Sequence, residues 1–523
     1  MLRSPYLLIA FTLTLLSISV RAAPKCEGEG NKEYCRDRLM HPDLPEPMRS
    51  TIRAVEGEEN NEYWRSQATE FVRAKLASQP NKNRAKNVIM FLGDGMGVTT
   101  TSATRNVIGG EEKELSFERF PYTGLSKTYS VDKIVPDSAC TATAYLCGVK
   151  AQEGTIGVTG AVPRTDCKAM LDESTHVDSI AKWAIDAGKW AGLVTTTRVT
   201  HASPSGVYAH IAERDWENDV EVSSDCGQNS GVQDIAYQLI NGEVGSKLKL
   251  IMGGGRKHFV DSTLSAEGKR ADGLNLIEEF QQAGAGNVYV STSDELEAVN
   301  LQETDRLLGL FNEDHLLYHL ETNENTTQPT LEQMTRKAIE YMNQSDEGYF
   351  LFIEGGRIDQ AHHMNKARMA LDETVQFSNA IAAARELTDE EDTLIVVTAD
   401  HSHVFSYGGY PYRGNDIFGT APVTAKDGKP YMVLSYANGP SAANFYTAEE
   451  LERVDPTTRV VGAHNDEFPA GVPLIDDTHG GDDVAVYASG PWSHLFTGVY
   501  EQNTIPHMMA YASCLGDGLT VCN

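Results

Sequence analysis

Carboxylate, imidazole and hydroxyl side chains follow closely after four apolar runs of the sequence. The runs cover residues 87–92, 190–197, 348–353 and 393–399. The polar residues that follow them are Asp94, then His201 and Ser203, then Glu354, then Asp400 and His401. Mixed sets of carboxylates and imidazoles are typical of zinc sites, whereas oxygen-only sets are typical of magnesium sites. The order of these residues therefore predicts metal chemistry.

Two further segments add to this set. Asp359 and His363 are four residues apart, so a helix would place both on one face, where they can bind one ion. His479 lies in the segment 477–481, just before another apolar run at residues 484–488. Taken alone, Asp94 between two glycines is a turn residue, and a lone histidine is a packed or surface residue. The metal interpretation depends on the whole set.

Ser138 opens a predicted helix directly after Pro136 and Asp137. A serine at a helix start is usually an N-cap, and without its context we would read Ser138 in that way. Beside metal ions, however, a serine hydroxyl becomes an activated nucleophile, and the helix N-terminus favours a bound anion.

The elements that must position these residues are strands and helices in alternation. The four runs are continuously apolar, as strands buried on both faces are, and helical segments such as 330–343 and 367–387 separate them. This alternation predicts a large α/β domain with a mostly parallel central sheet, in which ligands gather beyond the carboxyl ends of the strands. We expect this domain to span residues 87–523, with a smaller inserted lobe at about 410–476, where Gly, Pro and Asn interrupt the rhythm.

The N-terminal residues and the cysteines indicate a secreted, extracellular protein. Residues 1–22 read as a signal peptide, and residues 23–86 as an extension that includes a helix. No later run is apolar for long enough to span a bilayer. Asn325 and Asn343 match the glycosylation acceptor pattern. The cysteine spacings allow short loops at Cys26/Cys35 and Cys514/Cys522 and a longer one at Cys167/Cys226, whereas Cys140 and Cys147 lie too far apart on a helix for a direct bridge.

The net charge narrows the choice of partners. The chain of 523 residues carries a formal charge of -30. Such a surface repels nucleic acids and anionic membranes, so we expect neither as a partner. An anionic substrate would need strong local positive charge, and metal ions supply it.

Six segments together resemble the motif set of the alkaline phosphatases, and the likeness extends from about residue 87 to 522. They are residues 91–97 (FLGDGMG), 136–139 (PDSA), 195–204 (TTTRVTHASP), 354–359 (EGGRID), 398–403 (TADHSH) and 478–481 (THGG). The resemblance is closer to the animal enzymes, invertebrate ones in particular, than to the bacterial ones. It implies hydrolysis of phosphate monoesters at alkaline pH by a homodimer that holds two zinc ions and one magnesium ion per active site.

The resemblance also implies a role for each site residue. Asp359, His363 and His479 would hold one zinc, Asp94, Asp400 and His401 the other, and Asp94, Ser203 and Glu354 the magnesium. Ser138 would be the nucleophile that forms a phosphoserine, with Arg214 holding the phosphate and Asp137 orienting Arg214. The residues expected around these ligands are His201, His403 and Gln360.

The sequence departs from the family pattern in three respects. Cys140 stands where many relatives have Gly, and Gln360 where they have His or Lys near the phosphate, which puts that contact in doubt. Animal members can hold an additional calcium, but the matching positions here are Asn312 and Gln328. Because these are not acidic, we do not predict calcium.

The same residues also allow other functions. A phosphodiesterase or a sulfatase of the same superfamily could share this sheet and metal pair, although the magnesium set and Arg214 favour a phosphomonoesterase. An inactive secreted binding protein would have lost a ligand or the nucleophile, and the sequence keeps all of them. For the dimer, the segment 61–78 offers an apolar stripe of Tyr63, Trp64, Phe71, Val72 and Leu76, although such stripes are more often ordinary core.

Overall fold

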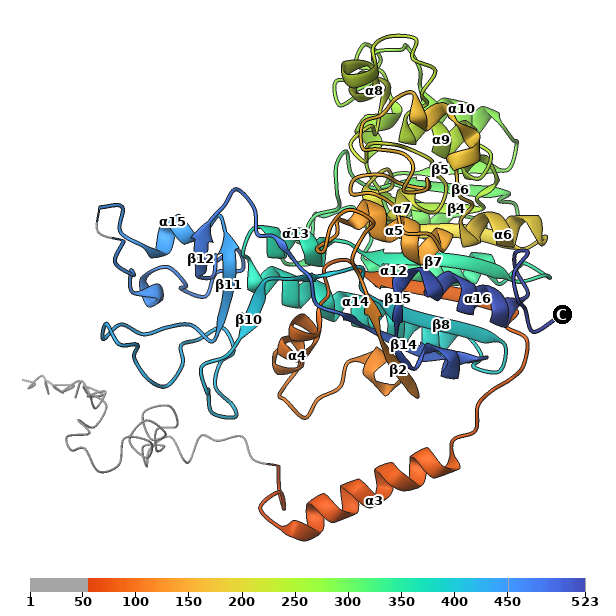
Figure 1. Ribbon diagram of the computed structural model, residues 1–523. Coiled ribbons are helices and arrows are strands. Elements are labelled where there is room, and N and C mark those ends of the chain that lie inside the picture. Colours follow the sequence, from red (N-terminus) through yellow and green to blue (C-terminus); the bar gives the residue numbers. More distant parts are fainter. Residues whose placement is uncertain (1–54, 450, 523) are drawn as a thin grey trace, which may run out of the picture.

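A ten-stranded sheet runs through the centre of the molecule (Figure 1). The computed structural model describes residues 55–449 and 451–522. The expected signal peptide (1–22), the first part of the expected extension, and Cys26 and Cys35 lie outside the described residues.

The strand order of the sheet is β15-β2-β14-β8-β1-β7-β3-β4-β6-β5. All pairings are parallel except those of β14 with β2 and with β8, so the predicted mostly parallel α/β sheet is confirmed. The strands are β1 (Asn87–Gly93), β2 (Tyr122–Lys127), β3 (Trp190–Arg198), β4 (Leu250–Gly254), β5 (Asn287–Val290), β6 (Arg306–Leu310), β7 (Tyr349–Gly355), β8 (Thr393–Thr398), β14 (Val484–Ser489) and β15 (Gly498–Glu501).

Helices cover both faces of the sheet (Figure 1). One face packs against α5 (Ser138–Cys147), α6 (Ile180–Asp186), α9 (Ile235–Asn241), α10 (Leu276–Gln282) and α16 (Ile505–Ser513). The other packs against α11 (Ser293–Ala298), α12 (Leu331–Met342), α13 (Arg357–His363) and α14 (Ala367–Leu387). Shorter or peripheral helices are α4 (Val98–Val107), α7 (Ala202–Ser205) and α8 (Asp219–Cys226).

The central strand β1 shows why these runs are continuously apolar. Val88, Met90 and Leu92 belong to the core on one face of the sheet, and Ile89 and Phe91 to the core on the other. Side chains of a strand alternate between faces, so a strand covered on both sides needs apolar residues at every position.

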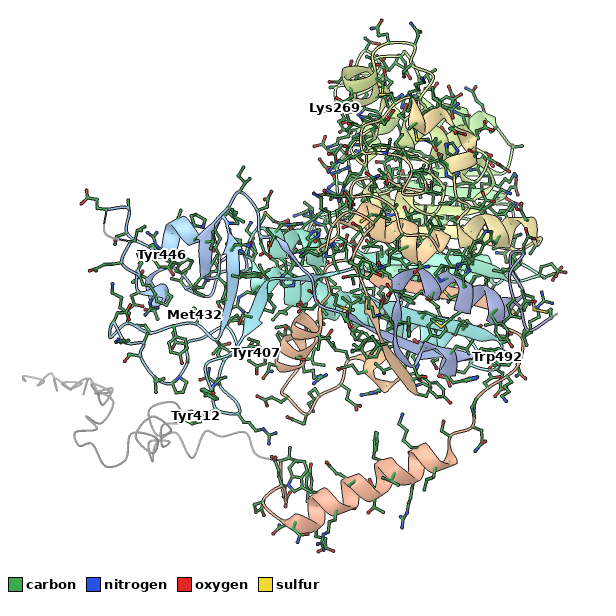
Figure 2. All side chains as sticks on the ribbon, viewed as in Figure 1. Lys269, Tyr407, Tyr412, Met432, Tyr446 and Trp492 are labelled. Atoms are coloured by element: carbon green, nitrogen blue, oxygen red, sulfur yellow. A yellow bond between two sulfur atoms is a disulfide. The ribbon has the colours of Figure 1, made fainter. Side chains whose placement is uncertain are left out.

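A smaller three-stranded sheet lies beside the main body, on the left in Figure 1. It consists of β10 (Phe405–Tyr407), β11 (Leu434–Gly439) and β12 (Ala470–Pro473), and α15 (Ala442–Phe445) packs near β12. Figure 2 labels Tyr407 of β10 and three side chains of the segment 410–476, Tyr412, Met432 and Tyr446. A hydrophobic cluster that includes Met432 and Phe468 packs this part against Ala103 of α4 and against Ala367 and Leu371 of α14. Between 410 and 476 the chain adds no strand to the ten-stranded sheet, although the small sheet already begins at Phe405.

Helix α3 (Asn61–Ala77) stands apart from the main body in Figure 1. None of its residues is buried, although it carries Trp64, Phe71, Val72 and Leu76. Its Lys75 Nζ donates a hydrogen bond to the carbonyl of Pro121, 2.8 Å away.

Within residues 55–449 and 451–522, disulfides join Cys167 to Cys226 and Cys514 to Cys522, in the pairings that their spacing allowed. Cys140 and Cys147 are buried free thiols. In the part of the chain that the structure describes, no helix has the length and apolar character needed to cross a membrane.

Candidate active site

The four strands whose ends carry the candidate residues lie next to one another, in the order β8-β1-β7-β3. They are parallel, so their carboxyl ends meet at one edge of the sheet. Asp94 and Asp400 follow β1 and β8, whereas Glu354 lies near the end of β7, opposite Leu92 on one side and Thr195 on the other. The topology therefore assembles the site from segments that are hundreds of residues apart.

The first cluster consists of Asp359, His363 and His479. His363 Nε2 lies 3.3 Å from Asp359 Oδ2 and 3.1 Å from His479 Nε2, and His479 Nε2 lies 3.5 Å from Asp359 Oδ1. Tetrahedral zinc with bonds of about 2.0–2.1 Å has ligand atoms about 3.3 Å apart. The three side chains thus already have the spacing of zinc ligands, and helix α13 supplies two of them from one face.

Backbone carbonyls fix the orientation of both imidazoles in this cluster. His479 Nδ1 donates to Pro136 O at 2.8 Å, and His363 Nδ1 donates to Asp477 O at 2.6 Å. A carbonyl can only accept a hydrogen bond, so the proton of each neutral ring sits on Nδ1 and the lone pair of Nε2 faces the cluster. Metal-binding histidines are typically held in this way.

The second cluster consists of Asp94, Asp400 and His401, all of which are fully buried. His401 Nε2 lies 3.0 Å from Asp400 Oδ2 and 3.6 Å from Asp94 Oδ1. His401 Nδ1 is directed to Ser402 O at 3.2 Å, so this ring too presents Nε2 to the cluster. The rings of His401 and His479 stack with centroids 3.5 Å apart, so the two clusters adjoin.

Ser138 completes the second cluster. Its Oγ lies 3.1 Å from His401 Nε2 and 3.4 Å from Asp94 Oδ1, so the hydroxyl joins these ligand atoms at the same spacing that they have among themselves. Asp137 caps helix α5 with its Oδ1, which accepts from the N–H of Cys140 at 3.2 Å. The nucleophile candidate therefore stands at the first position of a capped, fully buried helix.

A third group lies on the other side of Asp94. Ser203 Oγ donates to Asp94 Oδ2 at 3.5 Å. Glu354 Oε2 accepts from the hydroxyls of Thr195 and Thr197, whereas its Oε1 is buried without a hydrogen-bond partner. Burial raises the pKa of Glu354 to about 7, against the lowering effect of the two threonine hydroxyls. An unpartnered carboxylate oxygen beside a hydroxyl and a second carboxylate is a donor set that suits magnesium.

The density of buried carboxylates supports cation binding. Burial, together with the charges of Asp400, Asp359 and Glu354, raises the pKa of Asp94 well above its ordinary value. Several carboxylates packed this closely need compensating positive charge, and bound metal ions provide it.

Arg214 is the cationic side chain that the site holds in place. Its Nη1 donates to Asp137 Oδ2 at 3.0 Å and its Nη2 to His201 Nε2 at 3.3 Å. Burial acts to raise the pKa of Asp137, but the Arg214 guanidinium and the N–H of Gly154 hold it well below its usual range. The guanidinium is thus fixed at Asp137, the residue before Ser138, and its planar fork suits two phosphate oxygens.

The remaining expected neighbours lie around these groups. His403 Nε2 contacts Asp359 Oδ1 at 2.6 Å, and its Nδ1 contacts Asp477 Oδ2 at 2.9 Å, so His403 fixes the carboxylate of Asp359 in the first cluster. Gln360 donates from Nε2 to His315 and accepts from Arg357. At the positions considered for calcium, Asn312 Nδ2 donates to His315 O and Gln328 Oε1 accepts from Leu317 N, so both amides are bonded to the backbone of one loop.

Sequence reasoning missed the residues that support the ligands. Thr195 and Thr197 hold Glu354, and Asp477 holds His403. Gly95, through its N–H, holds Asp400 Oδ1 at 3.0 Å. All four lie in or next to the motifs quoted above, so closeness to a candidate ligand was the signal that could have found them.

Comparison with known proteins decides the family. The family model described as alkaline phosphatase matches residues 85–515. The chain belongs to the alkaline phosphatase family. The membrane-bound alkaline phosphatase of Bombyx mori is 46% identical over 496 residues, which cover 91% of this chain and 89% of that protein. The human tissue-nonspecific isozyme is 46% identical over 488 residues, which cover 89% of this chain and 91% of that protein.

Solved structures give the same fold. The alkaline phosphatase of the Antarctic bacterium TAB5 aligns with a TM-score of 0.57 at 23% identity, covering 83% of this chain and all of that one. The Thermus thermophilus enzyme aligns with a TM-score of 0.59 at 22% identity, covering 84% and 93%. The predicted family, enzyme class and phosphomonoester hydrolysis are thus confirmed. The family and the grouping of Asp and His side chains in this chain support divalent metal cofactors.

Proposed function

We propose that the chain hydrolyses phosphate monoesters at alkaline pH through a phosphoserine on Ser138, with two zinc ions and one magnesium ion in its active site. The observation that carries this proposal is the position of Ser138 Oγ within the second cluster, 3.1 Å from His401 Nε2 and 3.4 Å from Asp94 Oδ1.

Each ion has a residue set of matching chemistry. Asp359, His363 and His479 would hold one zinc, and Asp94, Asp400 and His401 the other. Asp94, Ser203 and Glu354 would hold the magnesium through oxygen atoms alone. When bound, these ions neutralise the charge of the phosphoryl group, lower the pKa of a bound hydroxyl and stabilise the leaving oxygen.

Ser138, Arg214 and Asp137 have different roles in the proposed phosphoryl transfer. Ser138 Oγ forms a bond to phosphorus while the bond from phosphorus to the alcohol oxygen breaks, which leaves a phosphoserine and releases the alcohol. Arg214, fixed by Asp137, binds the equatorial phosphate oxygens and keeps the phosphorus in line with Ser138. Water then hydrolyses the phosphoserine, which regenerates the hydroxyl and releases inorganic phosphate.

Acid quenching during turnover tests the nucleophile. Acid protonates the metal ligands, so the intermediate should be trapped as a phosphorylated peptide that contains Ser138. Ser138→Ala should still bind metals and inorganic phosphate but should no longer transfer phosphate efficiently to added alcohols. A trapped phosphate on another residue, or transfer at the wild-type rate in the variant, would refute the assignment. A wild-type rate that is highest on a phosphodiester or a sulfate ester would refute the substrate class.

A second copy of this chain is the partner that helix α3 fits best. Trp64, Phe71, Val72 and Leu76 are 52%, 64%, 53% and 77% exposed, and Figure 2 shows α3 set apart from the main body. Apolar residues at this exposure on one long helix are typical of an interface. Light scattering should report a dimer for the metal-loaded protein and a monomer for Phe71→Glu with Leu76→Glu. A monomeric wild type would contradict the proposal.

Secretion and glycosylation complete the proposed function. Asn325 and Asn343 are both exposed, as acceptor sites must be. Protein from a secreting eukaryotic host should lose mass on treatment with peptide N-glycosidase F, and Asn325→Gln with Asn343→Gln should remove this change. Recovery of the protein only from cell lysate would contradict secretion.

A further inference from the structure

An exposed apolar segment lies directly before the nucleophile. Val131, Ile134 and Val135 are 56%, 87% and 37% exposed, in the loop between β2 and α5. Single exposed apolar residues are normal, but three within five positions form a patch that needs a reason. We call these three residues the apolar ledge.

The ledge borders the first cluster. Pro136, the next residue along the chain, accepts the hydrogen bond from His479 Nδ1 at 2.8 Å. Gly481, two residues beyond His479, lies so close that a Cβ there would be 3.2 Å from Val135 Cγ2 and 3.6 Å from Ile134 O. The Val135 side chain and the Ile134 carbonyl are therefore packed against the segment that supplies His479.

This position is where the organic part of a substrate must lie, given the proposed function. Ser138 belongs to the second cluster, and an in-line displacement places the leaving oxygen on the side of phosphorus away from Ser138. In the proposed assignment, the first cluster with His479 would lie on that side. Ile134 and Val135 are the exposed apolar residues packed beside the segment that supplies His479, so they border that side.

Hydrogen bonds hold the ledge in a fixed shape. Ser130 N donates to Lys133 O at 3.0 Å, and Lys133 N donates back to Ser130 Oγ at 2.9 Å, which closes the turn. Val131 N donates to Ala151 O at 3.1 Å. A surface that already has its bound shape loses little conformational entropy when a ligand binds. The fixed shape of this loop therefore favours a role in binding.

We propose that the apolar ledge binds the alcohol part of the substrate, so that the enzyme prefers phosphate monoesters of apolar, aryl or alkyl, alcohols over esters of polar alcohols. Ile134, the most exposed member, is the residue that sets this preference. The inference rests on the proposed function and names the substrate class for the same site.

The test compares two esters of alkyl alcohols, 2-phenylethyl phosphate and glycerol 1-phosphate, in wild type and Ile134→Ser. We expect the ratio of their kcat/KM values to fall about fivefold in Ile134→Ser, which corresponds to about 1 kcal/mol of lost apolar contact. Val461→Ser, a matched change at a residue that is 73% exposed in the small lobe, should leave the ratio unchanged. Inhibition by 2-phenylethylphosphonate, relative to methylphosphonate, should weaken by a similar factor in Ile134→Ser and so report binding without turnover.

The outcomes separate the two proposals. If wild type hydrolyses neither ester, the proposed function fails. If wild type hydrolyses both and Ile134→Ser keeps the wild-type ratio and phosphonate selectivity, only the ledge proposal is overturned. A variant that keeps the ratio but changes the oligomeric state in light scattering would assign the ledge to an interface between copies, which also overturns it.

Discussion

Replacing Asp137 by Asn should weaken phosphate binding through Arg214 without disturbing the helix that carries Ser138. The two oxygens of Asp137 have separate tasks, because Oδ1 accepts from the N–H groups of Cys140 and Gly154 and Oδ2 accepts from Arg214 Nη1. Asn can keep the first task, since its amide oxygen can still accept. It loses the second, since its amide nitrogen would face the Arg214 donor.

The size of the effect follows from these contacts. A hydrogen bond to a charged group contributes about 1.5–3 kcal/mol. Arg214 keeps its bond to His201 Nε2, so we expect only part of this energy to be lost from phosphate binding. A loss of about 1.4 kcal/mol raises the inhibition constant of inorganic phosphate about tenfold. Arg214→Ala, which removes the phosphate contacts themselves, should raise that constant by more than a hundredfold.

A double-mutant cycle on the phosphate inhibition constant is the decisive assay. Because Asp137 acts through Arg214, Asp137→Asn should have little further effect once Arg214 is Ala, so the two changes should not be additive. Thermal unfolding provides the control, since Asp137→Ala should lose the helix cap and about 1 kcal/mol of stability that Asp137→Asn retains. Additive effects in the cycle would refute the idea that Asp137 is a positioning residue.

Three other predictions concern metals, acid and disulfides. Chelation should abolish activity, with zinc and magnesium restoring it. His479→Ala should lower zinc content measured by atomic absorption, whereas Ser203→Ala should mainly raise the magnesium requirement, and equal rescue of both by magnesium alone would contradict this division. Burial lowers the pKa of His258 to about 4, although the carboxylate of Glu217 acts to raise it. Below about pH 6.5 this histidine is protonated in the unfolded chain but stays neutral in the folded chain. The free energy of unfolding should therefore fall between pH 7 and pH 5, and this fall should be about 2 kcal/mol smaller in His258→Gln by denaturant titration; equal falls would disprove the assignment. Cys167→Ala opens a loop with a separation of 59 and should cost about 4 kcal/mol in chemical unfolding. Cys514→Ala, with its separation of 8, should cost about 2.5 kcal/mol, and the reverse order would count against the loop-entropy argument.

The sequence predicted the strands and their chemistry because both leave local signals. Continuous apolar runs mark strands buried on both faces, and polar residues after such runs mark the edge where ligands gather. Asp359 and His363 could be paired from their spacing alone, because a helix brings residues four apart together. The assignment of each ligand to an ion and the role of Arg214 came from the family resemblance, and these remain proposals.

Contacts between distant segments could not be predicted in this way. The hydrogen bond from His479 to Pro136 joins residues 343 apart, and neither segment carries a sequence pattern that predicts this contact. Helix α3 shows a different limit. Its apolar stripe could be read as ordinary core or as an interface, because periodicity reports that a face is apolar but not what covers it. Only the placement of α3, with no buried residue, favours the second interpretation.

The position of β1 between β7 and β8 has a consequence for how the protein is made. Asn87 of β1 pairs with Thr393 of β8. The ribosome synthesises β8 some three hundred residues after β1, so β1 cannot form this pairing until then. Long-range parallel pairing of this kind forms slowly and leaves apolar strands exposed in the meantime. During synthesis β1 must therefore be shielded from aggregation. No truncated chain that ends before β8 can close the centre of the sheet, and a chain that ends before His479 lacks one of the residues proposed to bind zinc. If His479 binds zinc as proposed, that site is completed only after the strands β1, β3, β7 and β8 have been synthesised.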